Sequence, residues 1–90
     1  MSKNNILVVE DEAIVSKDIQ QSLKKLGYNI VGASATGEKA IELANEHKPD
    51  LVLMDIMLKG EMSGIDTAEK IKEPLNIPVI YLQLMLMKIH

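Results

Sequence analysis

The sequence has 90 residues, and its 47% hydrophobic and 26% charged residues are typical of one small globular domain and exclude a disordered chain. Cysteine is absent, which excludes disulfides and thiolate zinc sites, and the net charge of -3 argues against nucleic acid or an anionic membrane as a partner. No segment has the length of a transmembrane helix or the apolar core of a signal peptide, so we expect a cytoplasmic protein.

The first predicted strand is the apolar run Ile6–Val9, which suits a strand buried on both faces. A helix is expected from Ala13, because apolar residues then recur at helical spacing. Gly27 is expected to end this helix in the left-handed conformation. The inward stripe of the predicted helix comprises Val15, Ile19, Leu23 and Leu26.

A second strand and helix follow with their own boundary signals. Residues 28–33 predict a strand, and Thr36 is placed to cap the next helix. This helix should stop before Pro49, because the residue preceding a proline avoids helical geometry. Its predicted inward residues are Ala40, Ile41 and Ala44.

The third predicted strand, Leu51–Asp55, carries the functional argument. Four apolar residues lead directly into a single acid, and a glycine-containing loop of residues 56–63 follows. In an open parallel sheet, ligands bind just beyond the carboxyl ends of the strands. An aspartate at a strand end is more often a turn former than a reacting group, so its role depends on whether other acids lie beside it.

A third helix and a fourth strand complete the alternation. Ser63 and Asp66 resemble a capping box, in which a hydroxyl residue caps the helix and an acid follows three residues later. We expect Pro74 to end this helix and residues 77–82 to form a strand. The predicted inward residues of the helix are Ile65, Ala68 and Ile71.

Alternating strands and helices predict an α/β fold with right-handed crossovers and a parallel sheet. In the flavodoxin-like, doubly wound strand order 2-1-3-4, the first and third strands are neighbours, so Glu10, Asp11 and Asp55 should meet at one end of the sheet. At ~4 Å and an effective dielectric of ~20, each pair of like charges repels by about 4 kcal/mol. Such a cluster persists where a cation neutralises it, and oxygen ligands suit Mg²⁺ or Mn²⁺.

The motifs and the order of elements together resemble the receiver domain of two-component response regulators, from Ile6 to Leu82. The motifs that carry the resemblance are Val8-Val9-Glu10-Asp11-Glu12, Leu51-Val52-Leu53-Met54-Asp55-Ile56, Gly64 and Pro78-Val79-Ile80-Tyr81-Leu82. The resemblance implies that Asp55 accepts a phosphoryl group from a phosphohistidine of a sensor histidine kinase. It also implies that Glu10, Asp11 and Asp55 hold Mg²⁺, together with the backbone carbonyl of Met57.

The resemblance stops after the fourth predicted strand. Gln83 stands where a receiver places a hydroxyl residue, and the family's later lysine, fourth helix, fifth strand and fifth helix are missing. We therefore interpret residues 1–90 as a truncated receiver domain with impaired phosphotransfer. We also expect it to associate with itself or with another receiver through the exposed edge of its fourth strand.

Residues 83–90 are an atypical tail with two explanations. One hypothesis is a frameshift, because codons exist for residues 83–88 that, read one base earlier, encode Thr-Ala-Tyr-Ala-Asp-Glu, as expected of a receiver. The alternative is a genuine terminus in which Leu84–Met87 cover exposed sheet. The nucleotide sequence past codon 82 distinguishes the two.

Two other functional interpretations remain open from the sequence. The first is a binding module, a receiver remnant that docks a partner without phosphorylation. The second is a Mg²⁺-dependent phosphohydrolase of similar topology, which usually carries a nucleophilic aspartate and another acid two residues later after its first strand. Here that strand is followed by Glu10-Asp11-Glu12, and no basic clamp accompanies it, so we interpret the chain as a signalling domain and not an enzyme. Glu12 is interpreted as solvated surface.

Overall fold

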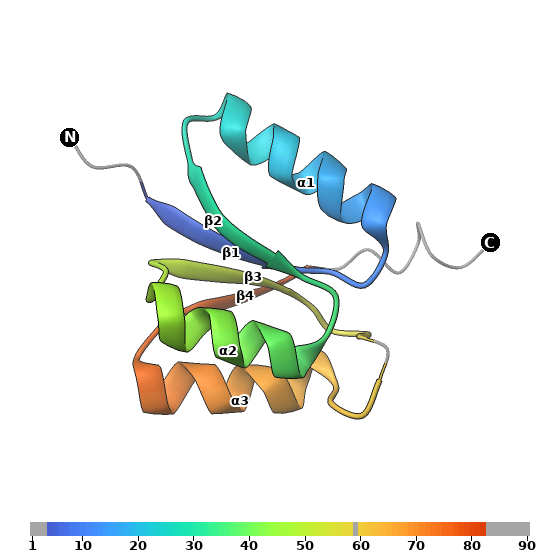
Figure 1. The fold of residues 1–90 in the computed structure, drawn as a ribbon, viewed down its shortest axis with the longest axis vertical. Helices are drawn as coiled ribbons and strands as arrows, with labels where there is room; N and C mark the ends of the chain where they lie inside the picture. The colour runs from blue at the N-terminus through green and yellow to red at the C-terminus, as the bar shows by residue number, and fades with distance from the viewer. Residues whose placement is uncertain (1–3, 59, 83–90) are drawn as a thin grey trace.

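The computed structural model describes residues 4–58 and 60–82, where strands and helices alternate (Figure 1). The elements are β1 (Asn5–Val9), α1 (Ala13–Lys25), β2 (Asn29–Ser34), α2 (Gly37–His47), β3 (Leu51–Asp55), α3 (Gly64–Leu75) and β4 (Val79–Leu82). Each predicted element is present in the predicted order. The predictions for Gln83 and for the tail fall outside the described residues.

The four strands form one parallel sheet in the order β2-β1-β3-β4, which confirms the predicted flavodoxin-like order. Val9 at the end of β1 lies beside Met54 of β3. The residues that follow them, Glu10 and Asp55, are therefore brought to the same end of the sheet. The Glu10 N–H also donates to the Ser34 carbonyl at 2.9 Å, which extends the contact with β2 past the last residue of β1.

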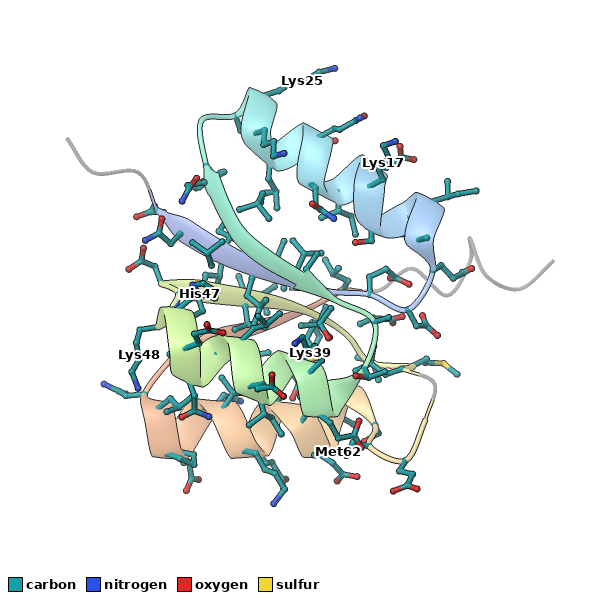
Figure 2. The ribbon with its side chains drawn as sticks, viewed as in Figure 1. Lys17, Lys25, Lys39, His47, Lys48 and Met62 are labelled. Atoms are coloured by element: carbon teal, nitrogen blue, oxygen red, sulfur yellow. The ribbon has the colours of Figure 1, made fainter. Side chains whose placement is uncertain are left out.

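The helices are distributed unequally over the two faces of the sheet. Figure 1 shows α1 on one side, with α2 and α3 on the other. α2 packs on β1 and β2, and α3 packs on β3 and β4, so together they cover all four strands on their side. α1 packs on β1 and β2, with Lys17 and Lys25 on its outer side (Figure 2). Among the described residues, no helix covers the α1 side of β3 and β4.

The hydrophobic core lies between the sheet and the pair α2 and α3. Alternate residues of β1 and β3 point to this side, as the period of two along a strand requires. Apart from Leu58 and Ile77, every buried member of this core comes from β1, β3, α2 or α3: Leu7, Val9, Ala40, Ala44, Val52, Met54 and Ile71. The small residues of α2 allow that helix to lie close to both the sheet and α3.

The predicted helix boundaries are mostly confirmed by specific contacts. Gly27, with a φ of 98°, ends the first helix in the left-handed region. The Thr36 hydroxyl accepts a hydrogen bond from the Lys39 N–H at 3.3 Å, and the Ser63 hydroxyl accepts one from the Asp66 N–H at 3.1 Å. Both predicted caps therefore use the side chain to satisfy an otherwise unpaired helix amide.

The predicted end of α3 was wrong. Pro74 lies inside the helix, which continues to Leu75 and is followed by Asn76 in the left-handed conformation. The φ angle that proline fixes is itself helical. In the last turn, its missing N–H therefore removes one helical hydrogen bond without ending the helix.

Two predicted inward faces also need correction. Ile65 is 49% exposed, and the buried residues of α3 are Gly64, Thr67, Ala68 and Ile71. On α1, Leu26 is 73% exposed, and the other three residues of the predicted stripe are only half-buried. The cause is the position of α1 over two strands, where little of the molecule is available to cover its apolar side.

Among residues 4–58 and 60–82, no helix has the length and apolar character needed to cross a bilayer.

Candidate metal centre

Three carboxylates converge at the carboxyl end of the sheet. Glu10 and Asp11 follow β1, and Asp55 is the last residue of the neighbouring strand β3. One carboxylate oxygen from each of the three lies within 4.8 Å of the others. The strand order that the sequence predicts is thus sufficient to bring these acids together.

The burial of the acids makes their proximity costly. Glu10 is 2% exposed and Asp55 is 3% exposed, whereas Asp11 is half-buried at the opening of the site. Burial reduces the screening of like charges by water and also removes hydration from each carboxylate. A positive charge placed among the three oxygens would lower both costs.

Backbone contacts fix Glu10 in this position. The Glu12 N–H donates to Glu10 Oε2 at 2.9 Å, at the turn from β1 into α1. The backbone N–H of Glu10 is bonded to β2 as well, so hydrogen bonds position both the main chain and the side chain of this residue.

The loop after β3 holds Asp55. The Met57 N–H donates to Asp55 Oδ1 at 3.1 Å, and the Gly64 N–H donates to the Ile56 carbonyl at 3.1 Å. A Cβ on Gly64 would collide with the Asp55 carbonyl oxygen and would lie 2.9 Å from the Ile56 Cα. The start of α3 is therefore packed directly against the backbone that carries Asp55, an approach that requires glycine.

Glu12 is a neighbour of the site, although its sequence context led us to interpret it as solvated surface. Its Oε1 is buried and, within the described part of the chain, has no hydrogen-bond partner. Its carboxylate is not part of the three-acid group. The sequence signal was present in the acidic run that follows β1, but the direction of the third side chain could not be read from it.

The donor set fits a hard divalent cation. Three carboxylates and no nitrogen or sulfur ligand match the preference of Mg²⁺ and Mn²⁺ for oxygen. The half-buried Asp11 leaves the site open to water, which Mg²⁺ usually retains in part of its coordination shell. Met57 contributes its N–H to Asp55, and coordination by its carbonyl stays a prediction. Gln83 lies outside the described residues.

Comparison with known proteins supplies a family for this arrangement. The response regulator receiver domain family matches residues 6–85. The transcriptional regulatory protein PdtaR of Mycobacterium tuberculosis is 42% identical over 77 residues, which make up 86% of this chain. The signal receiver domain of a modulated diguanylate cyclase from Desulfovibrio desulfuricans matches 94% of this chain with a TM-score of 0.85 and 30% identity.

A third similar structure is a complex. The anti-anti-sigma factor PhyR of Bartonella quintana, crystallised with the anti-sigma factor NepR, matches 93% of this chain with a TM-score of 0.81 and 33% identity. The chain spans 37% of PdtaR, 71% of the Desulfovibrio receiver chain and 36% of the PhyR chain. The similarity therefore concerns the receiver portion of the longer relatives.

Proposed function

The chain belongs to the response regulator receiver domain family, and on this basis we propose that Asp55 is its phosphoacceptor. Receiver domains of response regulators are signalling domains and not typical enzymes. The observation that carries the proposal is the convergence of Glu10, Asp11 and Asp55 within 4.8 Å at the carboxyl end of the parallel sheet. Asp55 is the member that ends the central strand β3, next to the loop into α3.

The proposed reaction is a transfer between two nucleophiles. An Asp55 carboxylate oxygen attacks the phosphorus of a phosphohistidine, a phosphorus–oxygen bond forms, and the phosphorus–nitrogen bond breaks with its electron pair passing to the imidazole. The product is an acyl phosphate on Asp55 and a free histidine on the donor. Water can later attack the acyl phosphate, which releases inorganic phosphate and restores the carboxylate.

The surrounding residues hold the reacting group in place. The Met57 N–H orients the Asp55 carboxylate, and Gly64 keeps the loop closed behind it. Glu10, Asp11, Asp55 and the Met57 carbonyl are the residues that would hold the cation, Mg²⁺ or Mn²⁺. When bound, the cation would neutralise the acids and orient the phosphoryl oxygens for in-line transfer.

The partner implied by this chemistry is a sensor histidine kinase. The resemblance to PhyR, whose structure contains the anti-sigma factor NepR, supports a protein partner for the output as well. A cytoplasmic location stays a prediction.

The test uses a small phosphodonor, because no kinase is identified. The protein is incubated with acetyl phosphate and Mg²⁺, and its intact mass is measured over time. We expect an adduct with the mass of one phosphoryl group that is lost at alkaline pH, as acyl phosphates are. Asp55→Asn should abolish the adduct, whereas Asp50→Asn, at an exposed position before β3, should leave it unchanged. An adduct of equal yield on the Asp55→Asn protein would contradict the assignment.

A phosphorylation-independent binding module is the second candidate. It is favoured by the PhyR complex and by the lack of a covering helix, within residues 4–58 and 60–82, on the α1 side of β3 and β4. If this candidate is right, Asp55→Ala will bind a captured kinase or regulator as tightly as the unchanged chain. If Asp55 must be phosphorylated first, that binding will be lost.

A further inference from the structure

Glu12 is an acid beside the candidate metal centre to which the proposed reaction gives no role. It follows Asp11 directly and lies at the turn from β1 into α1, where its N–H donates to Glu10 Oε2 at 2.9 Å. The residue as a whole is half-buried, but its Oε1 atom is buried. Within residues 4–58 and 60–82, no group donates a hydrogen bond to that oxygen. Folding has therefore taken this oxygen out of water without supplying a donor from the described part of the chain.

The contacts of α1 do not account for the Glu12 carboxylate. Glu12 immediately precedes the first turn of α1, yet its side chain accepts no hydrogen bond from a helix amide, unlike Thr36 before α2 and Ser63 before α3. It contributes to the helix through its backbone carbonyl, which accepts the Ser16 N–H at 2.9 Å. The ion pairs between described residues lie within α2 and do not include it. Neither helix capping nor an ion pair explains the position of this acid.

A fourth carboxylate adds to the electrostatic cost at this end of the sheet. Glu10, Asp11 and Asp55 already bring three acids together, and Glu12 is adjacent to them in the chain. Buried polar atoms of folded proteins are nearly always satisfied, and one that lacks a protein donor typically binds an ordered water or an ion. Repulsion among the acids and burial of the Glu12 oxygen both favour a partner that is a positive charge or a water polarised by one.

We infer that Glu12 is a positioning residue that accepts a hydrogen bond from a water ligand of the divalent cation. The inference rests on the proposed function, which assigns that cation to the three acids. Glu12 is not a member of the group whose oxygens lie within 4.8 Å of one another, so its contribution passes through water. A water ligand lies about 2.1 Å from Mg²⁺ and donates over about 2.7–2.8 Å, which extends the reach of the ion to a carboxylate outside that group.

An acceptor in this position suits Mg²⁺ in particular. Mg²⁺ releases its waters reluctantly and usually keeps several of them in a protein site. A carboxylate that binds one of these waters stabilises the ion without displacing a ligand. Loss of residues that hydrogen-bond the ligands of a metal typically weakens its binding 10–100-fold. Because Glu12 is only half-buried, we expect an effect of about 10-fold, at the lower end of this range.

The experiment measures cation binding and not phosphorylation. Isothermal titration calorimetry with Mg²⁺ gives the dissociation constant of the full 90-residue chain and of two variants. Glu12→Met keeps a side chain of similar length but removes the carboxylate, and we expect the dissociation constant to rise about 10-fold. The matched control is Glu61→Met, which removes an acid from an exposed position in the loop between β3 and α3. Its dissociation constant should equal that of the unchanged protein.

Melting temperatures in a chelator separate this role from a structural one. Without a cation, Glu12→Met should melt no lower than the unchanged protein, because it removes a buried oxygen without a donor and one of four neighbouring negative charges. In Mg²⁺ the variant should melt lower than the unchanged protein. A melting temperature lowered by the same amount in chelator and in Mg²⁺ would assign Glu12 a structural role and overturn the inference.

Glu12→Gln separates the hydrogen bond from the charge. It keeps an acceptor oxygen without the charge, so it should bind Mg²⁺ more tightly than Glu12→Met does. Equal dissociation constants of the two variants would show that charge alone acts and would also overturn the inference. Should Glu12→Met not fold, Glu12→Gln is compared with Glu61→Gln. Severalfold weaker Mg²⁺ binding by Glu12→Gln is then the expected result, and equal binding is the contrary one.

The same titrations distinguish failure of this inference from failure of the proposed function. If the unchanged protein and Glu12→Met bind Mg²⁺ equally well, Glu12 has no role at the cation, and the site of three acids stands. If the unchanged protein binds no Mg²⁺, the cation site and the role of Glu12 are both wrong.

Discussion

Gly64, the first residue of α3, lies directly against the backbone carbonyl oxygen of Asp55, the last residue of β3. A methyl group at position 64 would collide with this oxygen, and only backbone is available to move. We therefore expect Gly64→Ala to lower the free energy of unfolding by about 2 kcal/mol, as overpacking does. Because the shifted backbone carries Asp55, the rate of its phosphorylation by acetyl phosphate should fall as well.

Gly32→Ala is the matched control for this prediction. A Cβ at position 32 would meet only the ends of the Leu43 and Leu7 side chains, at an ordinary contact distance of 3.4 Å. Denaturant titration should show a clear loss of stability for Gly64→Ala and little change for Gly32→Ala. Mass spectrometry should show the same difference in the rate of phosphorylation. Equal losses would mean that the close approach to Asp55 has no special role.

The order of the elements and the meeting of the acids could be predicted from sequence, because both depend on the period of apolar residues and on the end of each strand. The face of α3 that points into the core could not be predicted in this way. Choosing its most apolar residues placed Ile65 inward, whereas the buried position is taken by Thr67. Thr67 lies where α3 meets α2 so closely that a Cβ on Gly37 would collide with its hydroxyl. Packing between two helices selects small residues there, and hydrophobicity alone does not reveal this.

If the cluster of Glu10, Asp11 and Asp55 binds a divalent cation, the stability of the folded state will depend on that cation. A cation present at 100 times its dissociation constant stabilises the folded state by about 2.7 kcal/mol. We expect Mg²⁺ to raise the melting temperature of the unchanged protein, and Asp11→Asn to lose most of this increase. In the presence of a chelator, Asp11→Asn should have a higher melting temperature than the unchanged protein. The variant then has one fewer negative charge among the carboxylates that repel one another.

Glu69→Gln is the control for the cation effect, since it removes one exposed acid from α3, away from the cluster. It should respond to Mg²⁺ as the unchanged protein does. The melting temperatures of all three proteins are measured by differential scanning fluorimetry, once in Mg²⁺ and once in chelator. If Asp11→Asn keeps the full response to Mg²⁺, the three acids do not form the cation site.

Ser63 should contribute to stability through its hydroxyl. This group accepts the Asp66 N–H at 3.1 Å, while the Ser63 carbonyl separately accepts the Thr67 hydroxyl at 2.8 Å. Ser63→Ala removes only the first contact, and we expect it to cost about 1 kcal/mol. Ser63→Asp retains an acceptor and should keep most of the stability. Urea denaturation of the two variants checks this, and an alanine variant as stable as the aspartate variant would show that the cap is dispensable.

The unequal coverage of the sheet predicts different costs for two isoleucines. Ile71 of α3 is fully buried in the core, whereas Ile80 of β4 is 52% exposed on the other face. Ile71→Ala should cost about 2–5 kcal/mol because it leaves a cavity, a large part of the ~5–15 kcal/mol that stabilises a typical domain. Ile80→Ala leaves no enclosed cavity. We therefore expect it to lower the free energy of unfolding by less than about 1.5 kcal/mol, because a half-exposed side chain has less buried apolar area to lose. Denaturant titrations of both variants at equal concentration measure the difference, and a larger loss for Ile80→Ala would mean that the core does not lie under α2 and α3.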